Sequence, residues 1–300
     1  MNNRVYNNLI RTINTENPCF LIGNGINRYN QKKSEGDVSW EGLLLDIYND
    51  LSPKKRNFIP EGIALPEFYD IIDLVKDGKV KTSLQKEFAD KLDWKPKAHH
   101  RNVIAKIKER NAQILTTNFD FVLQKAANAD MYRYRVEGLR LLSDFYPWDS
   151  YFSDSEQSDP FNSFSIWHMH GQKNYHRSIK LGLNQYLLMV ERAKRYFPTT
   201  NKNENEKPYQ TWLKLLFEKD LIIMGLGLQE QEIFIRWLLL QRAKHFKNRP
   251  ELRKKGFYIN HAKSSKQNVG KKFFMKSVGI DYVDFIGDYE GFYDRFWNEI

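Results

Sequence analysis

Short apolar runs recur along the chain, and amphipathic segments separate them. Each run is three or four residues long, which suits a strand that is buried on both faces of a sheet. The runs lie at residues 19–22, 112–115, 165–167, 221–224, 257–259 and 282–285. Helical periodicity is found at residues 66–76, 84–92, 99–110, 119–127, 184–196, 229–246 and 289–300. Strands that alternate with helices predict an α/β fold with a doubly wound, mainly parallel sheet.

Three segments depart from this alternation. Residues 41–110 contain several predicted helices and no convincing strand, so we expect a helical insertion within one domain that spans residues 1–300. Residues 143–165 contain five acidic residues, two prolines and neither Lys nor Arg, which predicts an acidic surface loop. Residues 199–208 are polar and predict a second surface loop.

The composition excludes several classes of protein. Hydrophobic residues make up 41% of the chain and aromatic residues 14%, enough for a sizeable core. The longest apolar stretch, residues 221–228, is far shorter than the roughly 20 residues of a membrane helix, and the N-terminus lacks the apolar segment of a signal peptide. The single cysteine, Cys19, excludes an internal disulfide and a zinc module built on cysteines. We therefore expect a cytoplasmic protein with no membrane partner.

The formal net charge of +10 is concentrated in one stretch. Between Arg242 and Lys276 there are twelve Lys or Arg residues and one acid, a balance of +11, so the remaining chain carries 10 − 11 = −1. Such a stretch could attract an acidic protein or a nucleic acid. A solvated helix end with its loop has the same composition, so both interpretations stay open.

Glycines and uncharged polar residues follow five of the predicted strands. In an open α/β sheet, ligands bind outside the carboxyl ends of the strands, so these residues predict a binding site. Glycines near a helix start allow backbone N–H groups to approach a phosphate, although a tight strand-to-helix turn uses glycine as well. The five strand ends are Gly23-Asn24-Gly25, Thr116-Thr117-Asn118-Phe119-Asp120, His168-Met169-His170-Gly171, Gly225-Leu226-Gly227 and Asn260-His261.

These motifs, in this order, resemble those of the sirtuin-like family of NAD-consuming domains, in particular its bacterial branch in antiphage defence. The similar segments are LIGNG at 21–25, SWEGLL at 39–44, TTNFD at 116–120, IWHMHG at 166–171, GLGL at 225–228 and Asn260. The resemblance implies a Rossmann-like fold and NAD⁺ as the substrate. It also implies cofactor-binding roles for Gly23, Asn24, Gly25, Thr117, Asp120, Gly225, Gly227 and Asn260.

The sequence departs from the family pattern at three places. Sirtuins that act on histones carry four zinc-binding cysteines, whereas this chain has Cys19 alone. The family serine after the second glycine is replaced near Asn27, and the acid expected beyond the fourth strand is found only at Glu230. These departures leave NAD binding plausible and argue against protein deacylation.

Asn118 and His170 are the catalytic residues that we expect. An amide can hold a ribose hydroxyl or a water molecule, and a histidine can accept the proton of that nucleophile. Asp120 then supports the ribose or holds the loop. Each residue has a structural alternative, because Asn118 or Asp120 could cap the helix that starts near residue 119, and His170 could be a buried strand-end histidine.

Two histidine pairs occur in the sequence, at 168 and 170 and at 99 and 100. His168 lies on the same strand face as His170 and could orient it or replace it as the base. A metal site at His168 and His170 is disfavoured because no further ligand is evident, so we expect no metal. His99 and His100 follow Pro96 at a predicted helix start, and we expect them on the surface.

Together these patterns predict an NAD⁺ hydrolase that releases nicotinamide and ADP-ribose and depletes NAD in antiphage defence, that is, in abortive infection. One alternative is a non-catalytic subunit that senses NAD or ADP-ribose. Another is a nucleic-acid-binding module that uses residues 242–276, and cyclisation of ADP-ribose also stays open. No sensor domain is evident in the chain, so we expect a homo-oligomer or a separate activating protein.

Overall fold

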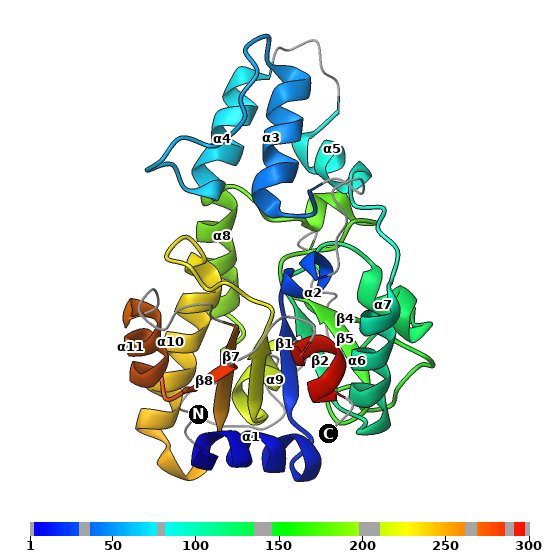
Figure 1. The fold of residues 1–300 in the computed structure, drawn as a ribbon, viewed down its shortest axis with the longest axis vertical. Helices are drawn as coiled ribbons and strands as arrows, with labels where there is room; N and C mark the ends of the chain where they lie inside the picture. The colour runs from blue at the N-terminus through cyan, green and yellow to red at the C-terminus, as the bar shows by residue number, and fades with distance from the viewer. Residues whose placement is uncertain are drawn as a thin grey trace.

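A sheet of eight described strands forms the centre of the molecule in the computed structural model (Figure 1). The structure describes residues 3–29, 37–76, 82–134, 146–197, 211–261, 269–285 and 291–297. The strands lie in the order β3-β4-β5-β2-β1-β6-β7-β8. The six strands from β5 to β8 in this order are parallel, whereas β4 is antiparallel to both β5 and β3. The structure thus confirms the predicted doubly wound, mainly parallel α/β sheet.

The predicted apolar runs form the six parallel strands. β1 lies at the centre, with Cys19 opposite Gln113 of β2 on one side and Leu221 of β6 on the other. Numbered along the chain, the parallel strands take the order 3-2-1-4-5-6, in which the direction of winding reverses between β1 and β6. These strands are β1 (Cys19–Ile22), β2 (Gln113–Thr116), β5 (Ser165–His168), β6 (Leu221–Met224), β7 (Gly256–His261) and β8 (Asp281–Phe285).

Side chains of successive strand residues point to opposite faces of the sheet and pack into two separate cores, one on each face. Phe20 and Ile22 pack into the core beneath α1 (Asn3–Thr15), α6 (Ala98–Glu109), α7 (Val122–Ala127) and a C-terminal π-helical segment (Gly291–Phe296). Cys19 and Leu21 pack into the opposite core, beneath α8 (Leu183–Lys194), α9 (Leu213–Glu218), α10 (Ile233–Asn248) and α11 (Val269–Ser277). Because apolar side chains cover both faces, the central strands are hydrophobic throughout.

Three helices form a unit with a core of its own, above the sheet in Figure 1. They are α3 (Trp40–Leu51), α4 (Leu65–Val75) and α5 (Leu84–Asp90). The hydroxyls of Ser39 and Ser83 accept hydrogen bonds from the first turns of α3 and α5, which fixes where these helices begin. The predicted insertion at 41–110 is too long, because α6 packs on the sheet and not on this unit.

The predicted acidic loop at 143–165 is wrong for the part that the structure describes. Residues 150–153 form β4 (Ser150–Ser153), which pairs with β3 (Asp130–Arg133) and β5. The segment is buried at its aromatic side chains, including those of Trp148, Tyr151 and Phe161. These aromatic residues outweigh the acids, of which Asp154 and Glu156 are exposed. Residues 143–145 and the polar segment 199–208 lie outside the described residues.

The basic stretch at 242–276 contains a residue that is not on the surface. Arg242 is 1% exposed, and its guanidinium donates hydrogen bonds to the backbone oxygens of Leu216 and Lys255, both at 2.8 Å. It therefore joins α9, α10 and the start of β7. Arg253, Lys254 and Lys255 remain exposed, and residues 262–268 lie outside the described residues.

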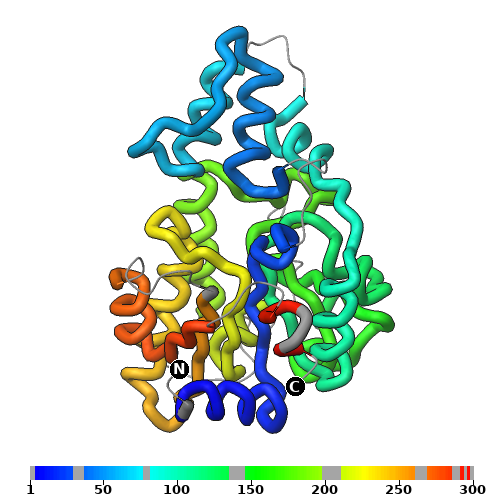
Figure 2. Tube along the Cα trace, viewed as in Figure 1, coloured from blue at the N-terminus to red at the C-terminus, as the bar shows by residue number. Residues whose placement is uncertain are grey.

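Within the described residues, no helix is long and apolar enough to cross a membrane. Both ends of the described chain lie near α1, on the side of the sheet away from the helical unit (Figure 2). A short helix, α2 (Gly25–Arg28), follows β1 directly and lies beneath the helical unit (Figure 1).

Candidate active site

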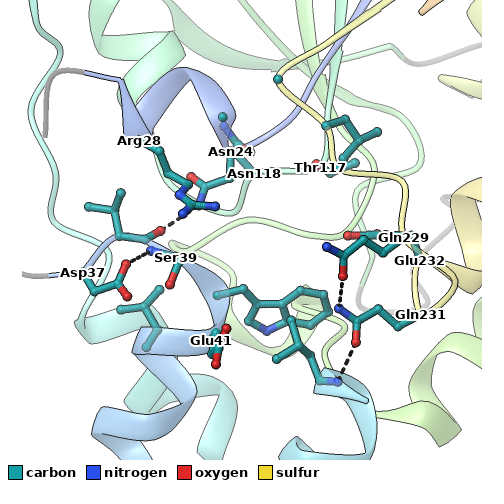
Figure 3. Close-up of a pocket in the computed structure, with 18 of the residues that line it drawn as sticks. Asn24, Arg28, Asp37, Ser39, Glu41, Thr117, Asn118, Gln229, Gln231 and Glu232 are labelled. Carbon is teal, nitrogen blue, oxygen red and sulfur yellow. Dashed lines mark hydrogen bonds between the residues drawn. The ribbon is translucent and has the colours of Figure 1, made fainter. Parts of the chain in front are cut away.

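A cleft of about 740 Å³ opens at the carboxyl ends of β1 and β6, where the winding of the sheet reverses. Small-molecule sites typically have volumes of about 300–1,000 Å³, and open α/β sheets place them here. Figure 3 shows Asp37 and Ser39 along one side of the cleft and Gln231 and Glu232 along the other. Nine of the ten predicted site residues line it, namely Asn24, Gly25, Thr117, Asn118, Asp120, His170, Gly225, Gly227 and Asn260.

The two glycine turns after β1 and β6 pack directly on each other. A Cβ at Gly23 would lie 2.6 Å from the backbone oxygen of Gly225, and one at Gly25 would lie 2.7 Å from the Cα of Gly225. The N–H groups of Gly23 and Gly25 donate to Met224 and Gly225, at 3.0 and 2.7 Å. These two N–H groups are therefore occupied within the protein, and the missing side chains allow the two turns to pack on each other. Gly23 lies below the cleft and does not line it.

Asn118 follows β2 in a loop that local hydrogen bonds hold. The hydroxyl of Thr116 donates to the backbone oxygen of Ile22 at 2.9 Å and accepts from the Asn118 N–H at 3.1 Å. The Asn118 amide is buried, and neither its nitrogen nor its oxygen has a hydrogen-bond partner among the described residues. α7 begins at Val122, whose N–H donates to Asp120 at 2.8 Å. The Asp120 carboxylate thus satisfies the first N–H group of this helix, whose N-cap position is Phe121, and the Asn118 amide takes no part in capping.

A chain of side-chain hydrogen bonds connects Asp120 to the turn after β1. The Asn27 amide donates to Oδ2 of Asp120 at 2.9 Å and to Oδ1 of Asn24 at 2.8 Å. Asn24 in turn donates to the backbone oxygen of Val38, at 2.7 Å. Burial raises the pKa of Asp120. Asp120 and Asn24 are thus held in place at the floor of the cleft, and Asn27, where the family serine is absent, is the residue that joins them.

His99 and His100 are buried, which contradicts the expected surface position. The Nδ1 atom of His100 accepts from the Lys97 N–H at 3.0 Å, so its Nε2 carries the proton and donates to Asn27 at 3.1 Å. His99 bonds to the backbone oxygen of Ile26 at 2.9 Å. Burial, followed by the neighbouring His99, lowers the pKa of His100 to about 3. A neutral His100 therefore orients the Asn27 amide.

His168 and His170 end the same strand but have different surroundings. Nδ1 of His168 donates to the backbone oxygen of Asn118 at 2.7 Å, and its Nε2 accepts from the amide of Gln124. Burial lowers the pKa of His168 to about 4. Both of its ring nitrogens are engaged, so His168 holds the Asn118 loop and does not line the cleft.

His170 lines the cleft, and its Nε2 has no hydrogen-bond partner among the described residues. The rings of Phe119, Tyr186 and Phe234 surround it at centroid distances of 6.2, 5.5 and 5.9 Å. This apolar environment lowers the pKa of His170 to about 3 by burial, so its imidazole is neutral at pH 7. A neutral imidazole nitrogen without a partner can accept a proton from a bound nucleophile.

A comparison of the sequence with models of known protein families shows which family the chain belongs to. The model of the SIR2-like domain matches residues 112–283, which is 172 of the 300 residues. The chain belongs to the SIR2-like family. The match covers β2, β5, β6 and β7, and with them Asn118 and His170.

Solved structures similar to this SIR2-like chain include two Sir2 proteins. A Sir2 homologue in complex with NAD is 12% identical, with a TM-score of 0.41, over 98% of this chain and 93% of the other. A Sir2 bound to an acetylated peptide is 13% identical, with a TM-score of 0.36, over 98% of this chain and 97% of the other. No curated protein sequence matched the chain.

Asn260 lies on the far side of this SIR2-like cleft, at the end of β7. Its amide nitrogen donates to Oδ1 of Asp284 on the neighbouring strand β8, at 3.2 Å. Lys272 of α11 pairs with the other oxygen of Asp284 at 2.5 Å. Asn260 lines the cleft, and the hydrogen bond to Asp284 uses its amide nitrogen and not its amide oxygen.

Several cleft residues were not predicted from the sequence. Glu232 lies just before α10, beside Gln229 in Figure 3, and burial raises the pKa of its carboxyl to about 7. The predicted acid, Glu230, is exposed and does not line the cleft. A single acid in a loop carries no sequence signal for its orientation. Two cations, Arg28 and Lys271, also line the cleft.

The helical unit forms the upper wall of the cleft. Trp40, Ile63 and Leu92 line it from this unit. The Leu65 N–H donates to the side chain of Gln231 at 3.0 Å, which ties the unit to the sheet domain (Figure 3). Among the described residues, no group of three or more His, Cys, Asp or Glu side chains could hold a metal ion.

Proposed function

We propose that the protein hydrolyses NAD⁺ to nicotinamide and ADP-ribose. One observation carries this proposal: the Asn118 amide and His170 Nε2 are buried, lack partners among the described residues and line the same cleft. A buried polar group without a partner costs about 1–3 kcal/mol. A site that keeps three such atoms is prepared for a polar ligand.

The reaction needs the two groups in different roles. Nicotinamide leaves NAD⁺ as a neutral base, so no strong acid is required at the leaving group. The C1′–N bond breaks with its electron pair going to nicotinamide, a water oxygen bonds to C1′, and a water proton is released. The Asn118 amide holds the water or a ribose hydroxyl, and His170 Nε2 accepts the proton.

Other cleft residues suit a dinucleotide. The nearest atom to an added Cβ at Gly227 is Cγ of Gln229 at 3.9 Å, so the backbone of this cleft residue is not crowded. Arg28 and Lys271 supply positive charge for a diphosphate, and the amide of Asn260 adds a hydrogen-bonding group to the same cleft. These residues support NAD⁺ as the substrate, and Cys19 as the sole cysteine argues against the zinc module of a deacylase.

We place this activity in antiphage defence in the bacterial cytoplasm, because the motifs resemble that branch of the family most closely. An enzyme that drains NAD needs control, so oligomerisation or a partner protein is part of the proposal. A cyclase would use the same site with a ribose hydroxyl in place of water.

The test is nicotinamide release from NAD⁺ by the purified protein, with the sugar product identified by its mass. We expect Asn118→Ala and His170→Ala to reduce kcat by about 10²-fold or more. Asn184→Ala and His176→Ala are matched controls that do not line the cleft and should keep the activity. Activity that survives both cleft substitutions contradicts the assignment. Tight NAD⁺ binding with no turnover, even with activators, would instead support a sensing subunit.

A further inference from the structure

A second hollow, of about 660 Å³, opens where the last two strands of the sheet begin. Gly256 and Asp281, the first residues of β7 and β8, both line it. β8 is the edge strand of the sheet, and α11 packs beside it (Figure 1). This hollow and the cleft share no lining residue, and the proposed hydrolysis of NAD⁺ gives the hollow no role.

Positive charge dominates the second hollow, which we call the basic groove. Two acids, Asp281 and Asp284, and five cations line it, so the net charge of its side chains is +3. A groove of one charge attracts ligands of the opposite charge and raises their local concentration. The basic groove therefore suits an anionic ligand. Its five cations are Arg253, Lys254, Lys255, Lys272 and Lys276.

Three of the five cations are available to a ligand. The other two, Lys255 and Lys272, pair with acids of the chain. Arg253, Lys254 and Lys276 are exposed and form no ion pair with another described residue. The guanidinium of Arg253 lies 3.4 Å from the position of a Cβ at Gly279, so it extends from the segment before β7 to the turn before β8. Cations from two separate elements thus converge on the groove, where they can contact successive phosphates of one strand.

α11 adds an exposed aromatic ring beside these cations. Phe273 is 74% exposed, and it lies on the same face of the helix as Lys272 and Lys276. The ring of Tyr282 lies in the groove with Nζ of Lys272 5.1 Å from its centroid. The Tyr282 hydroxyl is buried and has no hydrogen-bond partner among the described residues. A ring that can stack on a base and a hydroxyl that can donate to a phosphate therefore accompany the charge.

We propose that the basic groove binds single-stranded nucleic acid. The phosphates of the strand contact Arg253, Lys254 and Lys276, and one base stacks on Phe273. A nucleic acid fits better than an acidic polypeptide because every base has a flat face for an exposed aromatic ring. A single strand fits better than a duplex because the bases of a duplex are already stacked on one another. The inference does not depend on the proposed hydrolysis of NAD⁺.

The first test measures the affinity of the full chain for a fluorescein-labelled oligothymidylate of about 20 nucleotides, by fluorescence anisotropy. Each phosphate contact with a single strand contributes about −0.7 to the slope of log K against log salt concentration. Three to five contacts therefore predict a slope of about −2 to −3.5 between about 50 and 300 mM KCl. Joint replacement of Arg253, Lys254 and Lys276 by glutamine should make this slope shallower by about 2.

A matched variant separates the groove from the overall charge of the chain. Lys194, Lys244 and Lys247 are exposed and lie outside the groove, so their joint replacement by glutamine removes the same charge elsewhere. This control should keep the slope of the wild type. All six positions are exposed, so both variants should fold, which circular dichroism checks. A slope that the groove variant and the control change equally overturns the inference.

The second test examines the aromatic contact. Phe273→Ala should weaken binding of the oligothymidylate by about 10-fold, and Phe273→Trp should keep the affinity. Phe58 is 66% exposed and lies between α3 and α4, so Phe58→Ala is the matched control and should bind as the wild type does. Unchanged affinity in Phe273→Ala contradicts the stacked base and with it the assignment to a single strand.

Two competitors decide the class of ligand. Unlabelled oligothymidylate should displace the labelled strand, whereas a duplex of the same length and a polyglutamate peptide should displace it only at concentrations at least about 10-fold higher. A duplex or a polyglutamate that competes as well as the single strand overturns the inference, and so does a wild-type protein that shows no saturable binding. NAD⁺ is absent from the assay, so the result stands whether or not the protein releases nicotinamide.

Discussion

Replacement of Gly171 by alanine should remove more stability than any other glycine substitution near the cleft. Gly171 follows His170 directly and has a φ of +100°, which residues with a side chain rarely adopt. A Cβ there would lie 2.2 Å from the backbone oxygen of Ser178 and 2.6 Å from the backbone nitrogen of Ile179. Both neighbours are backbone atoms, so no flexible side chain can move aside.

The cost can be worked out from these two effects. A left-handed conformation costs an L-residue about 1–2 kcal/mol, and overpacking of this kind adds about 1–3 kcal/mol. The turn that would have to move is fixed, because the Ser178 N–H donates to Tyr175 at 2.7 Å and its hydroxyl accepts from Gln172 at 2.9 Å. We therefore expect Gly171→Ala to lower the free energy of unfolding by about 2–5 kcal/mol, a large part of the roughly 5–15 kcal/mol of a typical domain.

Alanine substitutions at two other glycines separate the backbone cost from the steric cost. Gly62 has a φ of +87° and nothing within 4 Å of an added Cβ, so Gly62→Ala should show the backbone cost alone, about 1–2 kcal/mol. Gly270 lies in the first turn of α11 with open space around it, and Gly270→Ala should be neutral or stabilise by up to about 1 kcal/mol. Urea unfolding of the three variants gives the comparison. A Gly171→Ala variant no less stable than Gly62→Ala would refute the steric argument.

Three further predictions test other parts of the structure. The pKa values of His100, His168 and His170, at about 3, 4 and 3, lie below the 6.5 of an unfolded chain, so the unfolded state takes up more protons as the pH falls. The folded state takes up one proton at Glu232, which offsets part of this effect. The free energy of unfolding, measured in urea, should therefore fall by about 2 kcal/mol from pH 6.5 to 5.5. An unchanged free energy of unfolding would contradict the burial of these histidines. Asn260→Ala should raise KM for NAD⁺ more than it lowers kcat, since it removes ground-state binding, and an unchanged KM would argue against this placement. Arg253, Lys254 and Lys255 line one surface groove with Lys272 and Lys276, and their replacement by glutamine should weaken the expected assembly in light scattering while the fold stays intact; full activity of a strictly monomeric, partner-free sample at all salt concentrations would refute this regulation.

The parallel strands were predictable because a strand that is buried on both faces of the sheet consists of a continuous run of apolar residues. β3 and β4 carry no such signal. β3 (Asp130–Arg133) is at the sheet edge and largely exposed, and β4 (Ser150–Ser153) has a serine at each end within an acidic segment. For these strands, pairing with a neighbour in the sheet decides the conformation, and pairing has no local period.

In the cleft, too, some residues could be placed from local sequence patterns, whereas others depend on tertiary contacts. Asn118 and His170 could be placed at the cleft because both follow strands whose carboxyl ends meet at one edge of the sheet, whereas their expected catalytic roles rest on the family resemblance as well. His99 was misplaced because its burial depends on tertiary contacts: it bonds to the backbone oxygen of Ile26 in α2, and the rings of Tyr29 and Tyr293 lie 4.8 and 5.8 Å from its ring, centroid to centroid. Glu232 was missed for a related reason: residues 230 and 232 are both acids just before α10, and the sequence pattern does not show that only Glu232 lines the cleft. The strands and the residues at their carboxyl ends can therefore be predicted from a sequence, whereas the other side chains that line the cleft depend on tertiary contacts that the sequence pattern does not encode.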